Sequence, residues 1–72
     1  MKNKEAFIKA LSTLFHSWGS DTPPEVIWGA NELLEWFELE FEVKLNIRFL
    51  EEGEPEYEGN YDKVIEAIQN LP

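Results

Sequence analysis

The chain has 72 residues, no cysteine, and 15 aspartates and glutamates against 6 lysines and arginines, which gives a formal net charge of −9 at pH 7. This length predicts one domain, residues 1–72, with a small core. The lack of cysteine excludes disulfides, thiol catalysis and cysteine-bound zinc, and the acidic charge disfavours direct binding of nucleic acid or of an anionic membrane.

The first residues, MKNKEAFIKALSTLF, form an amphipathic pattern rather than the uninterrupted apolar region of a secretion signal. No stretch of the sequence approaches the ~18 consecutive apolar residues that a membrane-spanning helix needs. We therefore expect a cytoplasmic, soluble protein that does not associate with a membrane.

Two amphipathic helices are predicted in the first half of the chain. Apolar residues recur at helical spacing over residues 3–18, and Gly19 follows where a helix end is expected. The sequence TPPE at residues 22–25 is typical of a capping box, with Thr22 as the cap of a second helix. Trp28 lies roughly opposite the core side of this helix, so we expect its side chain to be exposed. The predicted core positions are Val26, Ile27, Ala30, Leu33, Leu34 and Phe37.

From Phe37 onward the apolar residues alternate. They occupy every second position as far as Phe49, with polar residues between them, and this pattern is typical of a β-strand. No glycine or proline marks the change of period, and the helical pattern also fits as far as Phe41. We place the end of the helix near Leu39. The sequence LEEGE at residues 50–54 predicts a hairpin turn with Gly53 in a left-handed conformation, followed by a short edge strand over residues 55–59.

A final helix is predicted after this hairpin, with Asn60 as its cap. Its core-facing residues are Tyr61, Val64, Ile65, Ile68 and Leu71. The predicted order is helix, helix, strand, strand, helix. We therefore expect an α+β fold in which three helices pack on one face of an antiparallel β-hairpin.

The predicted long strand leaves an edge that its short partner does not cover, and this predicts a homodimer. When two copies of the strand are laid antiparallel with Val43 opposite Val43, Glu42 meets Lys44 across the outer face. Glu38 then meets Arg48, and a four-stranded sheet results. The predicted dimer interface comprises Phe37, Glu38, Leu39, Phe41, Glu42, Val43, Lys44, Leu45, Ile47 and Arg48.

The polar residues do not form a recognisable catalytic or metal-binding pattern. The glutamates between residues 51 and 58 alternate faces instead of occupying the loop positions of an EF-hand calcium site. Glu56 and Glu58 lie on an exposed edge, which offers no cleft for acid–base catalysis. His16, the single histidine, falls on the polar face of the first helix. We therefore expect no enzyme activity, no catalytic residues, no cofactor and no metal.

Two segments resemble acyl carrier proteins, which are also small and acidic. ELLEWFELEF at residues 32–41 is similar to the second helix of that family, and VIEAI at residues 64–68 is similar to its last helix. The family carries its phosphopantetheine arm on a serine within an Asp-Ser-Leu motif at the start of that second helix. This chain has GSDTPP there instead, so we assign neither the family nor its cofactor.

The surface left for function is acidic. The outer face of the predicted strand carries carboxylates, and Trp28 is an aromatic anchor of the kind enriched in interfaces. We predict a non-enzymatic protein-interaction domain, an adaptor, immunity-type or inhibitor protein that engages a basic partner surface. The residues predicted to contact this partner are Trp28, Glu38, Glu40, Glu42, Glu56 and Glu58.

An alternative is a nucleic-acid mimic that inhibits a DNA- or RNA-handling enzyme. Side chains on one face of a strand recur every ~6.8 Å, close to the spacing of phosphates along a single strand. Glu38, Glu40 and Glu42 match that spacing, but Lys44 and Arg48 interrupt the row. We therefore favour the basic protein partner.

Overall fold

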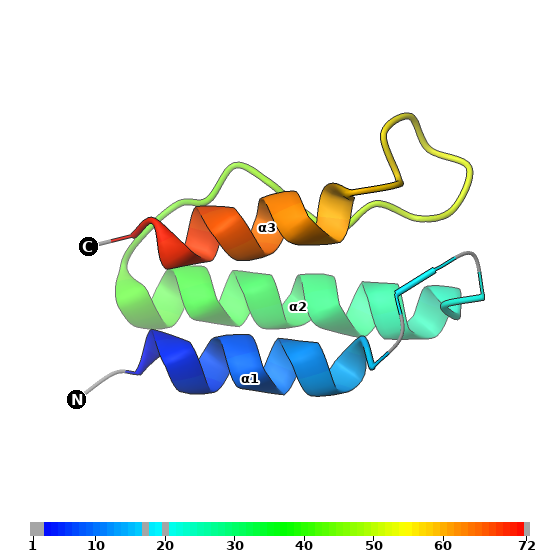
Figure 1. Cartoon of the computed structure of the whole chain (residues 1–72). Coiled ribbons are helices and arrows are strands. Elements are labelled where there is room, and N and C mark those ends of the chain that lie inside the picture. The colour runs from blue at the N-terminus through cyan, green and yellow to red at the C-terminus, as the bar shows by residue number, and fades with distance from the viewer. Residues whose placement is uncertain (1–2, 17, 20, 72) are drawn as a thin grey trace.

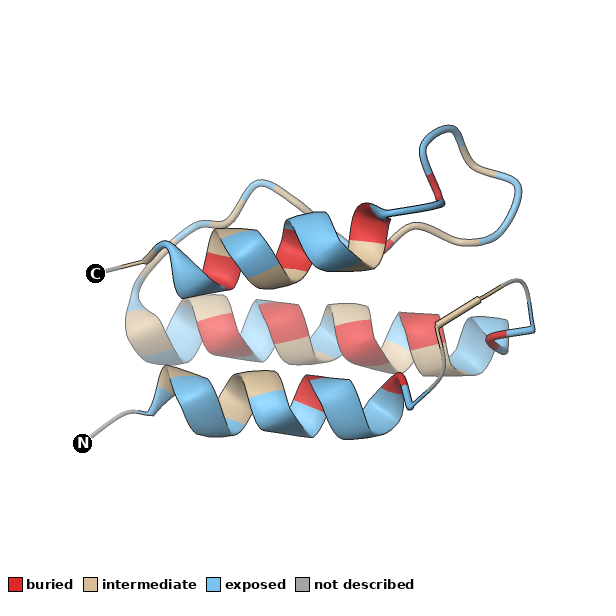
Figure 2. Cartoon of the chain, in the orientation of Figure 1, coloured by how far each residue is buried: buried red, intermediate tan, exposed pale blue. Residues whose placement is uncertain are grey.

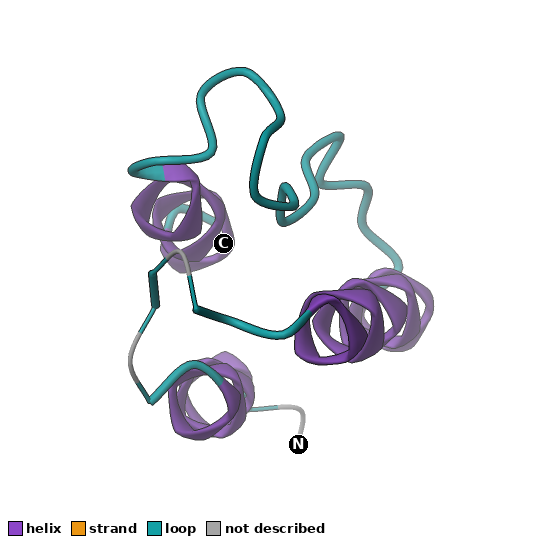
Figure 3. Ribbon diagram, turned by 90° about the vertical axis from the view of Figure 1, so that its right-hand side faces the viewer, coloured by secondary structure: helices purple, strands orange, loops and turns teal. Residues whose placement is uncertain are grey.

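The computed structural model describes residues 3–16, 18–19 and 21–71, and three helices lie within them. α1 spans Lys4–Leu14, α2 spans Pro24–Phe41 and α3 spans Asn60–Gln69. α2 runs antiparallel to α1, residues 42–59 return in the direction of α1, and α3 runs antiparallel to α1 again (Figure 1). Seen end-on, the helices occupy three corners of the molecule, and residues 42–59, which we call the third leg, lie across the fourth (Figure 3).

The structure is helical, and the predicted α+β fold with a β-hairpin is wrong: the described residues contain no strand. Residues 37–41, expected at the start of the long strand, form the last turn of α2. Phe37 and Phe41 fit a helical spacing as well as an alternating one, and their rings stack with centroids 4.3 Å apart. α2 ends at Glu42, which has a left-handed φ of 55° and whose backbone N–H bonds to the carbonyl of Glu38.

The alternation predicted for residues 43–49 is present, but it belongs to an extended segment and not to a sheet. Its apolar residues face the helices, and its polar residues are exposed. Asn46 interrupts the extended course with a φ of 58°, a left-handed conformation that asparagine tolerates. The N–H of Leu45 bonds to the carboxylate of Glu38 at 2.8 Å, so a helix side chain takes the place of a neighbouring strand.

Two asparagines attach the third leg to the helices. Asn31 on α2 donates from Nδ2 to the carbonyl of Phe49 at 3.0 Å, and its Oδ1 accepts from the N–H of Phe49 at 2.8 Å. The Oδ1 of Asn60 accepts from the N–H of Leu50 at 2.7 Å. Asn60 is therefore not the cap of α3 as predicted; it is the first residue of that helix, after the cap Gly59. Residues 55–59 form turns instead of the predicted edge strand.

The core lies where the inward sides of the helices meet the third leg (Figure 2). Phe49 is fully buried, and its ring centroid lies 4.7 Å from that of Phe15 on one side and 5.9 Å from that of Tyr61 on another. The core side predicted for α2 is confirmed, since its residues are buried or half-buried. The buried hydrophobic residues are Leu11, Phe15, Ile27, Ala30, Leu34, Phe37, Phe49, Tyr57, Val64 and Ile68.

Two helix ends differ from the prediction. α1 ends at Leu14 rather than at residue 18, although Trp18 still packs against the core. The cap of α2 is Pro23, which makes no side-chain capping bond, so the predicted capping box is wrong. The Oγ1 of Thr22 accepts from the N–H of Gly19 at 3.1 Å and so closes the turn before α2.

Residues 51–54 form a turn in which Gly53 has the predicted left-handed conformation, but the turn does not join two strands. Gly53 has a φ of 95°, and the N–H of Glu54 bonds to the carbonyl of Glu51 at 3.1 Å. The carboxylate of Glu54 lies 2.6 Å from the guanidinium of Arg48 and accepts from the N–H of Glu51 at 2.7 Å. Two hydrogen bonds lower the pKa of Glu54 below its ordinary value: the larger effect comes from Arg48 and the smaller from the amide of Glu51.

Glu54→Gln is expected to lower the melting temperature at neutral pH but not in strong acid. A carboxyl whose pKa is lowered by folding binds fewer protons in the folded than in the unfolded state, so its stabilisation is present at neutral pH and is lost as the pH falls through its folded pKa. The difference in melting temperature from the wild type should therefore shrink as the pH is lowered towards about 2. Glu52→Gln, at an exposed position of the same turn, is the control. An equal difference at both ends of the pH range would contradict the assignment.

Candidate functional site: the outer face of α2

The outer face of α2 exposes three large apolar side chains. Trp28 is 54% exposed, Trp36 is 72% exposed and Leu39 is 79% exposed. With 3.6 residues per turn, Leu39 lies about 20° and Trp36 about 80° around the helix axis from Trp28. The three side chains therefore share one side of the helix, and we call them the α2 apolar stripe.

Carboxylates surround this stripe. By the same geometry Glu32 lies between the two tryptophans, Glu35 lies at one edge, and Glu40 lies beyond the other edge. All three are exposed. The α2 sequence carries no lysine or arginine, and its acidic residues are Glu25, Glu32, Glu35, Glu38 and Glu40.

The charges on α2 work against the stability of the helix. Glu35 stands three residues from both Glu32 and Glu38, and like charges at this spacing destabilise a helix by ~0.2–0.5 kcal/mol per pair. The last turn has no basic residue, although cations are favoured there by the helix dipole. Because folding gains little from Glu32, Glu35 and the exposed rings, their combination on one face favours a role in binding.

The structure changes the surroundings of the residues predicted to contact a partner. Trp28 is exposed, as the helical spacing predicted. Glu38 and Glu40 lie on α2 instead of on a strand, and Glu38 is partly buried because its carboxylate holds the backbone of Leu45. Glu42 ends the helix. Trp28 and Glu40 thus belong to one exposed helix face, whereas Glu38 has a structural contact.

Trp36 and Leu39 were not among the predicted partner-binding residues. Leu39 was predicted to lie where the helix ends and the strand begins, among the residues of the dimer interface. A helical projection continued to Phe41 places Leu39 beside Trp28, so the signal was present in the sequence. The helical position of Leu39 was missed because apolar residues at 37, 39 and 41 also alternate with polar ones, which is the pattern of a strand.

The residues predicted to form the dimer interface do not form the strand on which that interface depends. Phe37 is only 2% exposed and lies in the core. Phe41, Val43, Leu45 and Ile47 are half-buried against the same core. Their apolar side chains are therefore used within the chain, and the predicted pairing of two strands is wrong. Homodimerisation itself stays a prediction.

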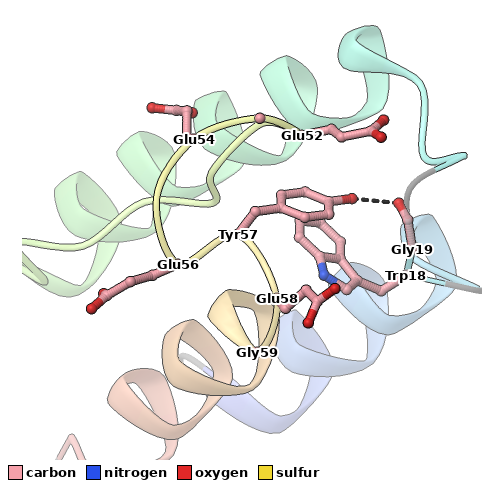
Figure 4. A pocket seen from close by; sticks show the side chains of 9 residues that line it. Trp18, Gly19, Glu52, Glu54, Glu56, Tyr57, Glu58 and Gly59 are labelled. Atoms are coloured by element: carbon pink, nitrogen blue, oxygen red, sulfur yellow. Dashed lines mark hydrogen bonds between the residues drawn. The ribbon is translucent and has the colours of Figure 1, made fainter.

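Glu56 and Glu58 lie away from α2, in the third leg. They line an open hollow together with Trp18, Tyr57 and other residues. The rings of Trp18 and Tyr57 stack with centroids 5.0 Å apart, and the hydroxyl of Tyr57 donates to the carbonyl of Gly19. The side chains of Glu54 and Glu56 point away from this ring pair, so the carboxylates of the hollow do not converge on one point (Figure 4).

The geometry on which the nucleic-acid mimic depended is also absent. The argument required Glu38, Glu40 and Glu42 in a row on one face of a strand. Glu38 and Glu40 instead lie two residues apart on a helix, so their side chains leave it on nearly opposite sides. The row of charges at phosphate spacing is therefore not formed by these residues.

The described residues contain no group of three or more histidine, aspartate or glutamate side chains placed to hold a metal ion. None of the helices described is both long and apolar enough to cross a membrane. No family model matches the sequence, and no curated protein or solved structure is significantly similar to it. The α2 apolar stripe with its carboxylates is the surface that best supports a function.

Proposed function

We propose that the chain is a non-enzymatic, acidic interaction domain, of the adaptor, immunity or inhibitor type, whose α2 outer face binds a basic protein partner. The observation that carries the proposal is the exposure of Trp28 and Trp36, at 54% and 72%, on one side of one helix. Tryptophan is enriched among the residues that dominate binding energy in interfaces. Exposed apolar patches bordered by polar residues commonly mark interaction surfaces.

The size of the stripe supports a contribution of the carboxylates to binding. Covering both tryptophan rings removes on the order of 300 Å² of surface from water, whereas a stable interface buries about 800 Å² on each partner. A partner therefore has to reach beyond the rings, and on α2 it then meets only carboxylates as charged groups. A basic partner is attracted by these groups and by the net charge of −9.

Affinity capture from an extract of the source cell tests the proposal. The wild-type chain is expected to retain a basic protein that elutes at raised salt, because salt screens the contribution of exposed charges. The double variant Trp28→Ala/Trp36→Ala should lose this protein, since truncating an interface hot spot costs ≥ ~2 kcal/mol.

The matched control is Leu14→Ala, which removes an exposed apolar side chain from α1. It should retain the partner as the wild type does. Circular dichroism of all the variants checks that each is folded. Retention of the same protein by the double tryptophan variant, at wild-type strength, would exclude the α2 face as the binding surface.

A further inference from the structure

We infer that the partner of the α2 face is a basic amphipathic helix that lies along α2, with apolar side chains on the α2 apolar stripe and lysines or arginines over the flanking glutamates. This inference rests on the proposed function, because it specifies the partner of the same surface. Three features of the structure support it: the shape of the stripe, the backbone bonds near it, and the positions of the charges.

The first feature is the shape of the stripe. Trp28 and Leu39 are separated by eleven residues of helix, or about 16 Å at 1.5 Å per residue. The stripe thus extends about three turns along α2, with Trp36 to one side of the line that joins Trp28 to Leu39. We call this line the ridge. A second helix has the same rise per residue, and its own apolar residues, spaced three and four apart, fall along a ridge of this length.

The second feature is the lack of a backbone edge for a strand to join. α2 uses its backbone groups within the helix, and residues 43–50, the nearest extended backbone, have several amides occupied. The N–H groups of Leu45, Phe49 and Leu50 are bonded to side chains of the helices. A partner that adds a β-strand gains its affinity from main-chain hydrogen bonds. The occupied amides therefore favour a partner recognised through its side chains.

The third feature is the position of the charges on both sides of the ridge. Glu35 lies about 20° from Trp28 on one side, whereas Glu25 and Glu40 lie about 60° and 120° from it on the other. A helix with one apolar side and basic residues on both borders matches this arrangement. A cation near the last turn of α2 also interacts favourably with the carbonyl end of its dipole.

Two other occupants fit the surface less well. A second copy of the chain laid along α2 would bring the exposed carboxylates of one helix, Glu25, Glu32, Glu35 and Glu40, against the same four of the other. An anionic membrane is repelled by the same charges. Both occupants remain measurable outcomes of the experiment below.

The test uses two synthetic peptides of about 18 residues, an amphipathic peptide and a scrambled peptide, made of the same leucines, lysines and alanines. The amphipathic peptide carries leucine at helical spacing with lysine on both borders, and the scrambled peptide distributes leucine around the helix. Titration calorimetry should show the amphipathic peptide binding at least tenfold more tightly. The double variant Trp28→Ala/Trp36→Ala should bind it roughly 30-fold more weakly, and Leu14→Ala should bind it as the wild type does.

A pair of charge variants tests the role of the carboxylates. Glu32→Gln/Glu35→Gln on α2 should weaken binding of the amphipathic peptide while leaving the melting temperature equal to or above that of the wild type, because like charges are removed. The control Glu52→Gln/Glu66→Gln changes the net charge by the same amount at exposed positions outside α2. It should bind the peptide more tightly than the α2 pair.

The outcomes separate the inference from the proposed function. Equal affinity for the two peptides, with loss of both in the tryptophan variant, would overturn the helical partner and leave the basic partner supported. Failure of both peptides to bind would overturn both proposals. Two results for the other occupants would also overturn the inference. One is a dimer in sedimentation that becomes a monomer in the double tryptophan variant, and the other is binding to vesicles of anionic lipid in place of the peptides.

Discussion

Phe49→Ala is expected to abolish cooperative unfolding of the chain at 25 °C. Phe49 has no exposed surface and lies among the rings of Phe15, Trp18 and Tyr61. Replacing a buried phenylalanine with alanine costs ~3–5 kcal/mol. A single core in a domain of this size supplies rarely more than ~3–5 kcal/mol, so the variant should lose essentially all of its stability. Urea denaturation followed by near-ultraviolet circular dichroism measures this loss.

Two further variants keep this prediction testable if Phe49→Ala does not fold. Phe49→Leu retains an apolar side chain and should remain folded with a smaller loss of stability. Leu39→Ala truncates an exposed side chain on α2 and should change the free energy of unfolding by less than about 0.5 kcal/mol. A cooperative transition in Phe49→Ala, with a loss below about 1 kcal/mol, would show that the third leg contributes little to the core.

Local sequence patterns were sufficient to predict that the three helices exist, although not where each begins and ends, and to predict one turn. The spacing of the apolar residues predicted which side of α2 is buried. It also predicted that the side chain of Trp28 is exposed, as it is in the structure. The sequence LEEGE placed Gly53 in a left-handed turn, with the φ of 95° that the structure has. These features depend on residues within a few positions of each other, so a local pattern contains the information that specifies them.

The end of α2 was not predictable because two patterns coincide there. Residues 37, 39 and 41 alternate with polar residues, but residues 37 and 41 are also one helical turn apart. The stacking of Phe37 on Phe41 within the helix is a contact that a strand would not make. Glu42 then adopts a left-handed conformation without being glycine, so the sequence shows no ordinary sign of the helix end.

The predicted sheet was wrong because alternation reports which side of a segment is buried, and not what bonds to its backbone. Residues 43–49 of the third leg bury every second side chain, fully or partly, as a strand on a core does. Its amides find side-chain acceptors on α2 and α3 instead of a neighbouring strand. Asn31 and Phe49 are 18 residues apart in sequence, so their contact leaves no local signal. The predicted partner face was wrong for the same reason: residues 38–40 were placed on a strand because they alternate, but they lie on α2.

Asn31 holds the third leg against α2 through two hydrogen bonds to Phe49, a role that no local sequence pattern indicates. Its amide group accepts from the N–H of Phe49 at 2.8 Å and donates to the carbonyl of Phe49 at 3.0 Å. That carbonyl also accepts from Nη1 of Arg48 at 3.2 Å, so the N–H is the group that loses its partner when Asn31 is removed. Phe49 is fully buried, so its N–H then has little access to water. An unsatisfied buried donor or acceptor costs ~1–3 kcal/mol, which is a large part of the stability of so small a domain.

Asn31→Ala is therefore expected to lower the free energy of unfolding by ~1–3 kcal/mol, measured by urea denaturation. Hydrogen exchange gives a more specific result, because the amide of Phe49 should lose protection while amides in the middle of α1 keep theirs relative to the new global stability. The matched control Asn70→Ala removes an exposed asparagine after α3 and should change stability by less than about 0.5 kcal/mol. Similar losses in the two asparagine variants would refute the role of Asn31. Full protection of the Phe49 amide in Asn31→Ala would refute it independently, because the N–H would then have an acceptor other than Asn31.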